Sequence, residues 1–163
     1  MRNVLIAVTI YIGLFTLTSV VLGLAFSSAA AIVVLASTHT DPLPLLRPWL
    51  RFAAPALAVV TCVKLLGELS VIRHRRDPGG DLGRSARLLL GELRGLLGLR
   101  AGLALFGGVV LPLVFFGAPE GVPLGALVTV ALSSASLLLA GELVERVLFF
   151  AAMSAPRMPG VVS

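Results

Sequence analysis

The sequence has 163 residues, of which 58% are hydrophobic and only 13% charged, and its mean hydropathy is +1.04. Soluble domains carry about 25% charged residues, so this composition excludes an ordinary soluble protein and indicates an integral membrane protein. The single cysteine, Cys62, excludes a disulfide framework, an iron–sulfur site or a zinc cluster built from this chain alone. The net charge of +5 comes from arginines between hydrophobic runs, which indicates membrane topology rather than nucleic-acid binding.

The first apolar run contains no charged residue between Arg2 and His39. Because it exceeds the roughly 20 residues that cross a hydrocarbon core, it predicts a first transmembrane helix at about 8–37. A cleaved signal peptide is the alternative, since a basic residue precedes the run and small residues follow in "AFSSAAA". The run is much longer than the roughly 7 to 15 apolar residues of a signal peptide, which favours a retained helix.

The rest of the chain predicts three more membrane helices. They are expected at about 49–72, 95–116 and 124–153. The segment "THTDPLPLLRP", residues 38–48, combines prolines with charges and predicts a connection outside the membrane. Gly107, Gly108 and Pro112 should bend or loosen the third helix. We therefore expect an all-α protein, a single membrane domain over residues 1–163 with four transmembrane helices.

A basic segment, "RHRRDPGGDLGRSARLLLGELR", precedes the third span. Its later arginines share one helix face, which predicts an interfacial amphipathic helix before that span. The residues expected to face lipid headgroups are Arg73, His74, Arg75, Arg76, Arg84, Arg87 and Arg94. Seven arginines lie in 73–100, two in 38–51 and none in 117–123, so the positive-inside rule places this segment and both termini in the cytoplasm.

Besides Arg51 at the start of the second helix, five charged residues lie inside the predicted second and fourth helices: Lys64, Glu68, Glu142, Glu145 and Arg146. Helical spacing lets each set face the bundle interior, and both sets are expected at one depth near the cytoplasmic face. They are either paired charges that stabilise the bundle or a proton-handling site. The second interpretation rests on the count of three carboxylates against two cations, which leaves one carboxylate without a partner.

Other chemistries have little support in the sequence. Its two histidines, His39 and His74, lie outside the predicted spans at opposite membrane faces, so no pair is expected to ligate a haem within the bilayer. No nucleophile and base stand at a useful spacing. We therefore assign this chain no catalytic residue and no metal ligand.

Two stretches of the chain resemble a known family. They are "RSARLLLGELRGLLGLRAGLALFGGVVLPLVFF" and "AGELVERVLFFAAMSAPRMPG". Together they are similar to the C-terminal half of the membrane-anchor subunits of dimethyl sulfoxide reductase and of NrfD-like polysulfide reductases, most clearly from about Lys64 to Gly160. Family members typically have eight spans, so this chain resembles half of an anchor. From the matching final motif, the resemblance implies that Glu142, Glu145 and Arg146 are structural or proton-path positions.

The resemblance implies a subunit of a quinone-linked oxidoreductase in a bacterial or archaeal cytoplasmic membrane. It would dock an iron–sulfur electron-transfer subunit and a molybdopterin catalytic subunit, and a second four-helix membrane subunit would supply the other half of the anchor. The iron–sulfur clusters and molybdopterin would belong to the partners. The chain itself would bind no cofactor, apart from quinone or quinol at an interface.

Two other functions are compatible with the sequence. Four spans with intramembrane carboxylates could form a small proton-coupled transporter, although the sequence contains no matching pair of broken helices. The chain could also be a structural or assembly subunit, in which case substitution of its charged residues would change only the yield of the complex.

Overall fold

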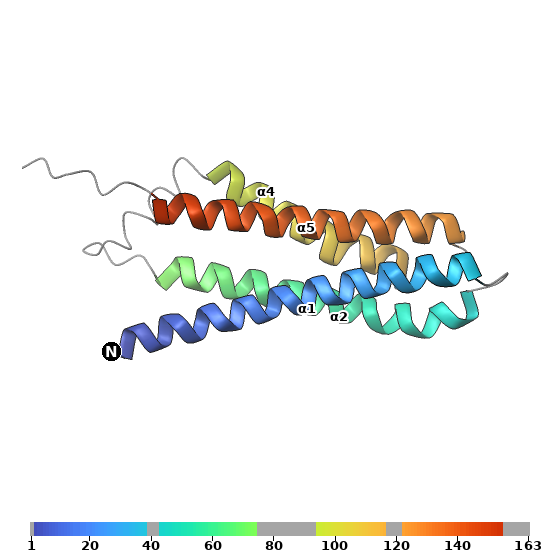
Figure 1. The fold of residues 1–163 in the computed structure, drawn as a ribbon, viewed down its shortest axis with the longest axis horizontal. Coiled ribbons are helices and arrows are strands. Elements are labelled where there is room, and N and C mark those ends of the chain that lie inside the picture. Colours follow the sequence, from blue (N-terminus) through green and yellow to red (C-terminus); the bar gives the residue numbers. More distant parts are fainter. Residues whose placement is uncertain (1, 39–42, 75–93, 117–121, 155–163) are drawn as a thin grey trace, which may run out of the picture.

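The computed structural model describes residues 2–38, 43–74, 94–116 and 122–154, and these residues form long antiparallel helices (Figure 1). The elements are α1 (Arg2–Thr38), α2 (Leu43–His74), α4 (Arg94–Leu105), two π-helical segments η1 (Phe106–Val110) and η2 (Pro112–Phe116), and α5 (Leu124–Ser154). Because α4, η1 and η2 follow one another almost without interruption, they form one rod, here called the third span. The predicted all-α bundle of four helices is confirmed.

Each rod is long and apolar enough to cross a bilayer, so the chain is a multi-pass membrane protein. The stretches that meet this condition are Ile12–Thr38, Leu43–Leu69, Arg94–Phe116 and Leu124–Leu148. Large apolar side chains such as Phe15, Phe52, Leu66 and Phe150 are exposed on the outer surface of the bundle. Such a surface suits a lipid solvent, in which apolar side chains face outwards and the backbone polar groups find their hydrogen bonds internally.

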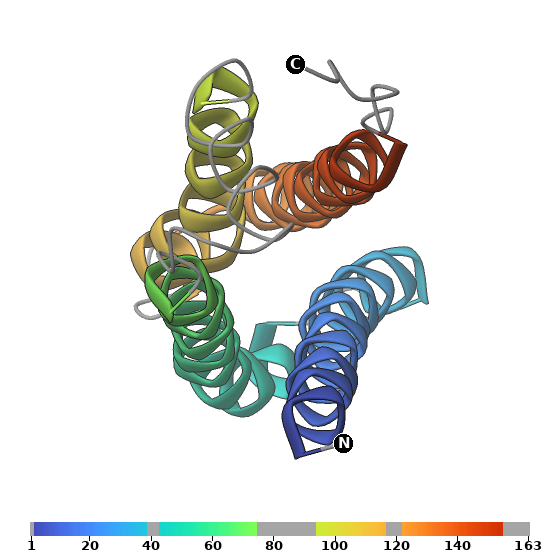
Figure 2. The same ribbon diagram turned by 90° about the vertical axis from the view of Figure 1, so that its left-hand side faces the viewer.

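The four rods pack as a ring when the bundle is seen from the end at which α1 begins (Figure 2). Helix α1 contacts α2 and α5, and the third span contacts α5 along its length and α2 mainly through η1 and η2. Helix α1 begins at the end where α5 finishes, so the first and last described residues lie at the same end (Figure 1). The ring has a common interior in which side chains from non-consecutive helices meet.

The apolar core occupies the half of the bundle away from that end. Its fully buried members include Val21, Ile32, Leu50 and Leu127, together with the π-segment residue Phe116. Several further positions are alanine, which allows close helix approach in membranes. The other half of the interior is therefore left for polar side chains.

The loosening predicted for the third span takes the form of the two π segments. Gly107 and Gly108 are buried in η1, and Pro112 opens η2 without a backbone N–H to donate. A Cβ on Gly107 would lie 3.0 Å from the Ser134 carbonyl oxygen of α5. A Cβ on Gly108 would collide with Thr61 of α2. The glycine pair thus lets two neighbouring helices approach the third span from different sides.

The second helix begins earlier than predicted. Residues 43–48 belong to α2, although the prolines of 38–48 indicated a connection outside the membrane. Pro48 and Pro55 both lie inside the helix. Prolines are tolerated in membrane helices because neighbouring groups and local adjustments satisfy the freed carbonyls. The predicted interfacial helix before the third span falls on residues 75–93, which lie outside the described residues.

Candidate functional site

Helical spacing places ionisable side chains of three rods in the interior. Lys64 and Glu68 are one turn apart on α2, and Glu142 and Glu145 are similarly spaced on α5, so each pair shares a helix face. Helix α4 adds Arg100, which is buried. The five residues Lys64, Glu68, Arg100, Glu142 and Glu145 form a connected set of ion pairs, here called the ion network.

Lys64 joins α2 to α5. Its Nζ donates to a carboxylate oxygen of Glu142 and to Oε2 of Glu145, the latter at 2.9 Å. Glu68 Oε1 lies 4.0 Å from the same Nζ. One ammonium group therefore contacts three carboxylates, two of them on another helix.

Arg100 joins the third span to both of those helices. Its two terminal nitrogens donate to the two oxygens of Glu68, and Nη2 also donates to Glu145 Oε2 at 2.7 Å. A bidentate contact between guanidinium and carboxylate fixes the orientation of both groups as well as holding them together. Glu145 accepts from Lys64 and from Arg100, so it links the two cations.

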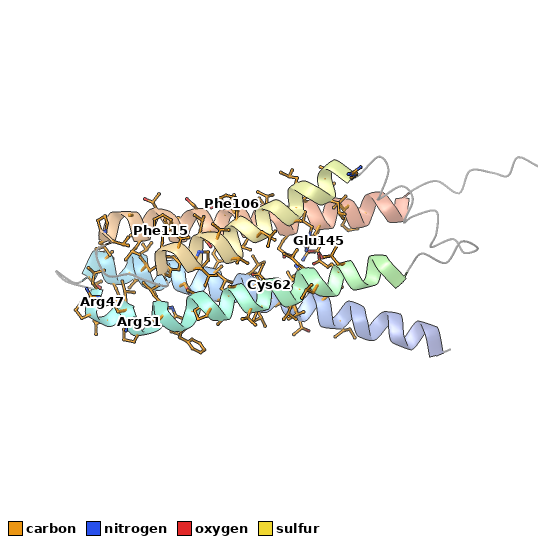
Figure 3. All side chains as sticks on the ribbon, turned by 180° about the vertical axis from the view of Figure 1, so that it is seen from behind. Arg47, Arg51, Cys62, Phe106, Phe115 and Glu145 are labelled. Atoms are coloured by element: carbon orange, nitrogen blue, oxygen red, sulfur yellow. The ribbon has the colours of Figure 1, made fainter. Side chains whose placement is uncertain are left out.

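The cations are the most enclosed members of the ion network. The Lys64 and Arg100 side chains are 4% and 7% exposed, whereas the Glu145 side chain is 33% exposed. Glu145 lies between the helices, in the half of the bundle opposite Arg47 and Arg51 (Figure 3). The two cations are therefore shielded from the surroundings of the bundle, and Glu145 is the member of the ion network that is most accessible from outside.

Most of the ion network lies at depths within a hydrocarbon core, towards one face, whereas Glu68, roughly 18 Å past the midpoint of Leu43–Leu69, reaches the interface. At a rise of about 1.5 Å per residue, Lys64 lies roughly 12 Å past the midpoint of Leu43–Leu69. Glu142 lies roughly 9 Å past the midpoint of Leu124–Leu148, on the same side. Both distances are smaller than the half-thickness of about 15 Å of a hydrocarbon core. The sequence analysis expected these residues near the cytoplasmic interface, and in the structure Lys64 and Glu142 lie at depths just inside the hydrocarbon core.

The number of carboxylates exceeds the number of cations, as the sequence suggested, but the partners differ. Glu68, Glu142 and Glu145 face Lys64 and Arg100, so the fully ionised set carries a formal charge of −1. The prediction that one carboxylate has no partner is wrong. Each carboxylate contacts at least one cation, because Lys64 and Arg100 each bridge more than one.

Arg146 does not fill the role of second cation that the sequence indicated. It is exposed, and its guanidinium lies 6.0 Å from the centroid of the Phe15 ring of α1. Glu142, Glu145 and Arg146 share a broad face of α5, but the arginine is at the edge next to α1. A guanidinium over an aromatic ring is a weak surface contact at such a site.

Arg100 is the residue that sequence reasoning missed as a site residue. It was counted among the basic residues of 73–100, which report topology. The available signal was its position inside the predicted span 95–116, because an arginine within a membrane segment usually faces a partner in the interior.

Three of the seven predicted headgroup-facing residues belong to the described helices. Arg94 is exposed at the start of α4, and Arg73 and His74 end α2. The other four, Arg75, Arg76, Arg84 and Arg87, lie outside the described residues. Their predicted role at the lipid surface stays a prediction.

Metal ligation finds no candidate among the residues that the structure describes, where no group of three or more His, Cys, Asp and Glu side chains is arranged to hold a metal ion. Comparisons with models of protein families, with curated proteins and with solved structures give no match for this chain. The interpretation of the ion network therefore rests on its own chemistry and on the sequence resemblance.

Proposed function

We propose that this chain is a membrane-anchor subunit, or half of one, of a quinone-linked molybdopterin and iron–sulfur oxidoreductase. It docks the electron-transfer subunit and supports the exchange of electrons and protons with quinol. The observation that carries the proposal is the ion network, which joins three rods inside the membrane. The resemblance of residues 64–160 to anchor subunits supplies the class of complex.

The ion network has the composition of a group that takes up and releases a proton. Three carboxylates and two cations carry a formal charge of −1 when all are ionised, so one added proton makes the set neutral. Ionisable residues within membrane segments commonly mark proton or substrate pathways. Glu145, as the most exposed carboxylate, is the member best placed to exchange a proton with its surroundings.

In this role the chain holds protons, while electron carriers belong to its partners. Oxidation of a quinol releases two protons for every two electrons, and the electrons leave through the partner's iron–sulfur clusters. Glu142 and Glu145 hold and pass on a proton, and Lys64 and Arg100 keep the carboxylates in position. The terminal substrate is converted on the molybdopterin subunit, away from this chain.

The same proposal orients the protein in a bacterial or archaeal cytoplasmic membrane. The arginine-rich segment 73–100 includes the end of α2 and the beginning of the third span, at the end of the bundle that holds the ion network. The positive-inside rule puts this end, with both termini, in the cytoplasm.

Co-purification tests the proposal most simply. The chain is tagged and expressed with its neighbouring genes, and the purified material is assayed for iron, molybdenum and associated subunits. We expect iron–sulfur and molybdopterin subunits to accompany it. Isolation of the chain alone, with substrate-dependent proton flux in proteoliposomes, would contradict an anchor and support a transporter. Isolation alone without flux would contradict both.

A further inference from the structure

Thr61 of α2 differs from the hydroxyl residues of the bundle that donate to their own helix. Thr16, Thr18, Ser28 and Thr129 each donate to the carbonyl one turn earlier in their own helix, which is the usual arrangement in membrane helices. Thr61 is only 2% exposed, yet its Oγ1 has no hydrogen-bond partner among the described residues. A buried hydroxyl without a partner is unfavourable because the hydrogen bonds it made to water are not replaced, so a second group is expected to meet it.

The Thr61 side chain lies against the π-helical part of the third span. It packs directly on Gly108, where a Cβ would lie 2.8 Å from Thr61 Cγ2. From α5, Ser134 donates to the carbonyl oxygen of Gly107 rather than to its own helix. Two buried hydroxyls, one from each neighbouring helix, therefore meet consecutive glycines of η1.

The π segment η1 leaves backbone groups that need hydrogen-bond partners from outside their own helix. The wider turn interrupts the regular ladder of the helix and leaves carbonyl groups to be satisfied by side chains or ordered water. Single π turns in α-helices are frequent at functional sites for the same reason. Ser134 satisfies one carbonyl directly, and Thr61 faces the same segment with its hydroxyl still free.

Thr61 lies one turn of α2 away from the ion network. Thr61 and Lys64 lie three residues apart on one face of α2, where Cβ atoms are about 5–6 Å apart. A single water molecule spans a gap of this size. Polar groups thus follow one another from Glu145, through Lys64 and Glu142, to Thr61 and the Gly107 carbonyl near the middle of the third span.

We propose that Thr61, Ser134 and the Gly107 carbonyl form a water-binding site that extends the ion network towards the middle of the bilayer. The hydroxyl of Thr61 can donate or accept, and the Lys64 ammonium and the η1 carbonyls supply the two to four polar contacts that a buried water needs. The site gives protons of the ion network a hydrogen-bonded route inward. It does not depend on the identity of the partner subunits.

Hydrogen–deuterium exchange of the full chain in lipid nanodiscs tests this site, with D2O as the probe and NMR to resolve single amides. We expect amides of 106–110 to exchange about tenfold or more faster than those of 98–104, because the proposed water lies against the former. Thr61→Val removes the hydroxyl at nearly constant shape and should slow the exchange at 106–110 to the level of 98–104. Thr61→Ser keeps the hydroxyl and should retain fast exchange.

Thr129→Val is the matched control, since Thr129 is exposed and bonds to its own helix. It should leave exchange at 106–110 unchanged. Equally slow exchange along the whole third span of the wild type would overturn the proposal, and so would fast exchange that persists in Thr61→Val. Unchanged exchange in α5 shows that each variant is folded. Because the measurement needs no partner subunit, its result is separate from the outcome of co-purification.

Discussion

Lys64 and Arg100 are charged side chains that the bundle encloses almost completely. Transfer of such groups out of water is costly, and the contacts to Glu68, Glu142 and Glu145 offset that cost only while all partners are present. Removal of one cation leaves carboxylates buried without compensation. The ion network therefore makes the packing of three rods depend on single residues.

Lys64→Met should be strongly destabilising for this reason. We expect a loss of about 3–5 kcal/mol in the free energy of unfolding, as found when one partner of a buried pair is removed. Equilibrium unfolding in mixed micelles measures it. Arg146→Met is the matched control, because that arginine is exposed and its guanidinium lies over the Phe15 ring of α1, and it should cost less than about 1 kcal/mol. Equal effects of the two variants would contradict the arrangement of charges described above.

At the scale of residues, the sequence predicted part of the candidate site. Lys64, Glu68, Glu142 and Glu145 could be grouped because spacing along a helix and depth from its ends follow directly from position. It could not be predicted in this way that Arg100, and not Arg146, is the second cation of the ion network. A broad helix face does not show which edge meets which neighbour, and that depends on the order of helices around the ring.

The third span is the element whose packing depends most on individual residues. Gly107 faces α5, with the Ser134 carbonyl and the Leu137 side chain nearby, and Gly108 faces Thr61 of α2. In contrast, Gly98 and Gly102 have open space where a Cβ would be placed. Glycines of one rod thus have different roles according to what they face.

Alanine substitution should separate these two classes of glycine. Gly107→Ala and Gly108→Ala should each destabilise by about 1–3 kcal/mol, because a neighbouring helix must move. Gly98→Ala and Gly102→Ala should be neutral or stabilising by up to about 1 kcal/mol, because alanine is the better helix former. Thermal unfolding in the same detergent compares them. A larger loss from the second pair than from the first would refute the close approach at η1.

At the scale of elements, hydrophobic length was sufficient to predict four spans. The ends were less predictable, since α2 continues through prolines that are usually found in connections. The loosening of the third span followed from Gly107, Gly108 and Pro112, whereas its π geometry did not. A π segment requires outside groups to satisfy it, and the Ser134 contact comes from another helix.

The whole molecule is divided along the membrane normal into an apolar half and an ionic half. The apolar core lies where α1 ends and α5 begins, and the ion network lies towards the opposite end. This segregation was predictable from the sequence as far as the common depth of the ionisable residues, whereas the choice of helix faces that meet was not. It means that changes to the ion network need not disturb the core in the other half.

Topology is the prediction that belongs to this scale. A fluorescent protein fused after Ser163 should be fluorescent, and alkaline phosphatase fused there should be inactive, because the arginine-rich end is expected in the cytoplasm. An alkaline phosphatase fusion within residues 117–121 should be active. The reverse pattern would show that the ion network lies near the outer face.

Proton handling by the ion network is tested most directly by quinol-dependent turnover of the purified complex carrying Glu142→Gln or Glu145→Gln. Each variant should lower turnover by about 10²-fold, as for loss of a proton-transfer group, while iron and molybdenum content stay equal to wild type. Arg146→Gln, at the edge of the same helix face, should retain activity. Undiminished turnover in both glutamine variants, with the complex intact, would contradict a role of these carboxylates in proton transfer.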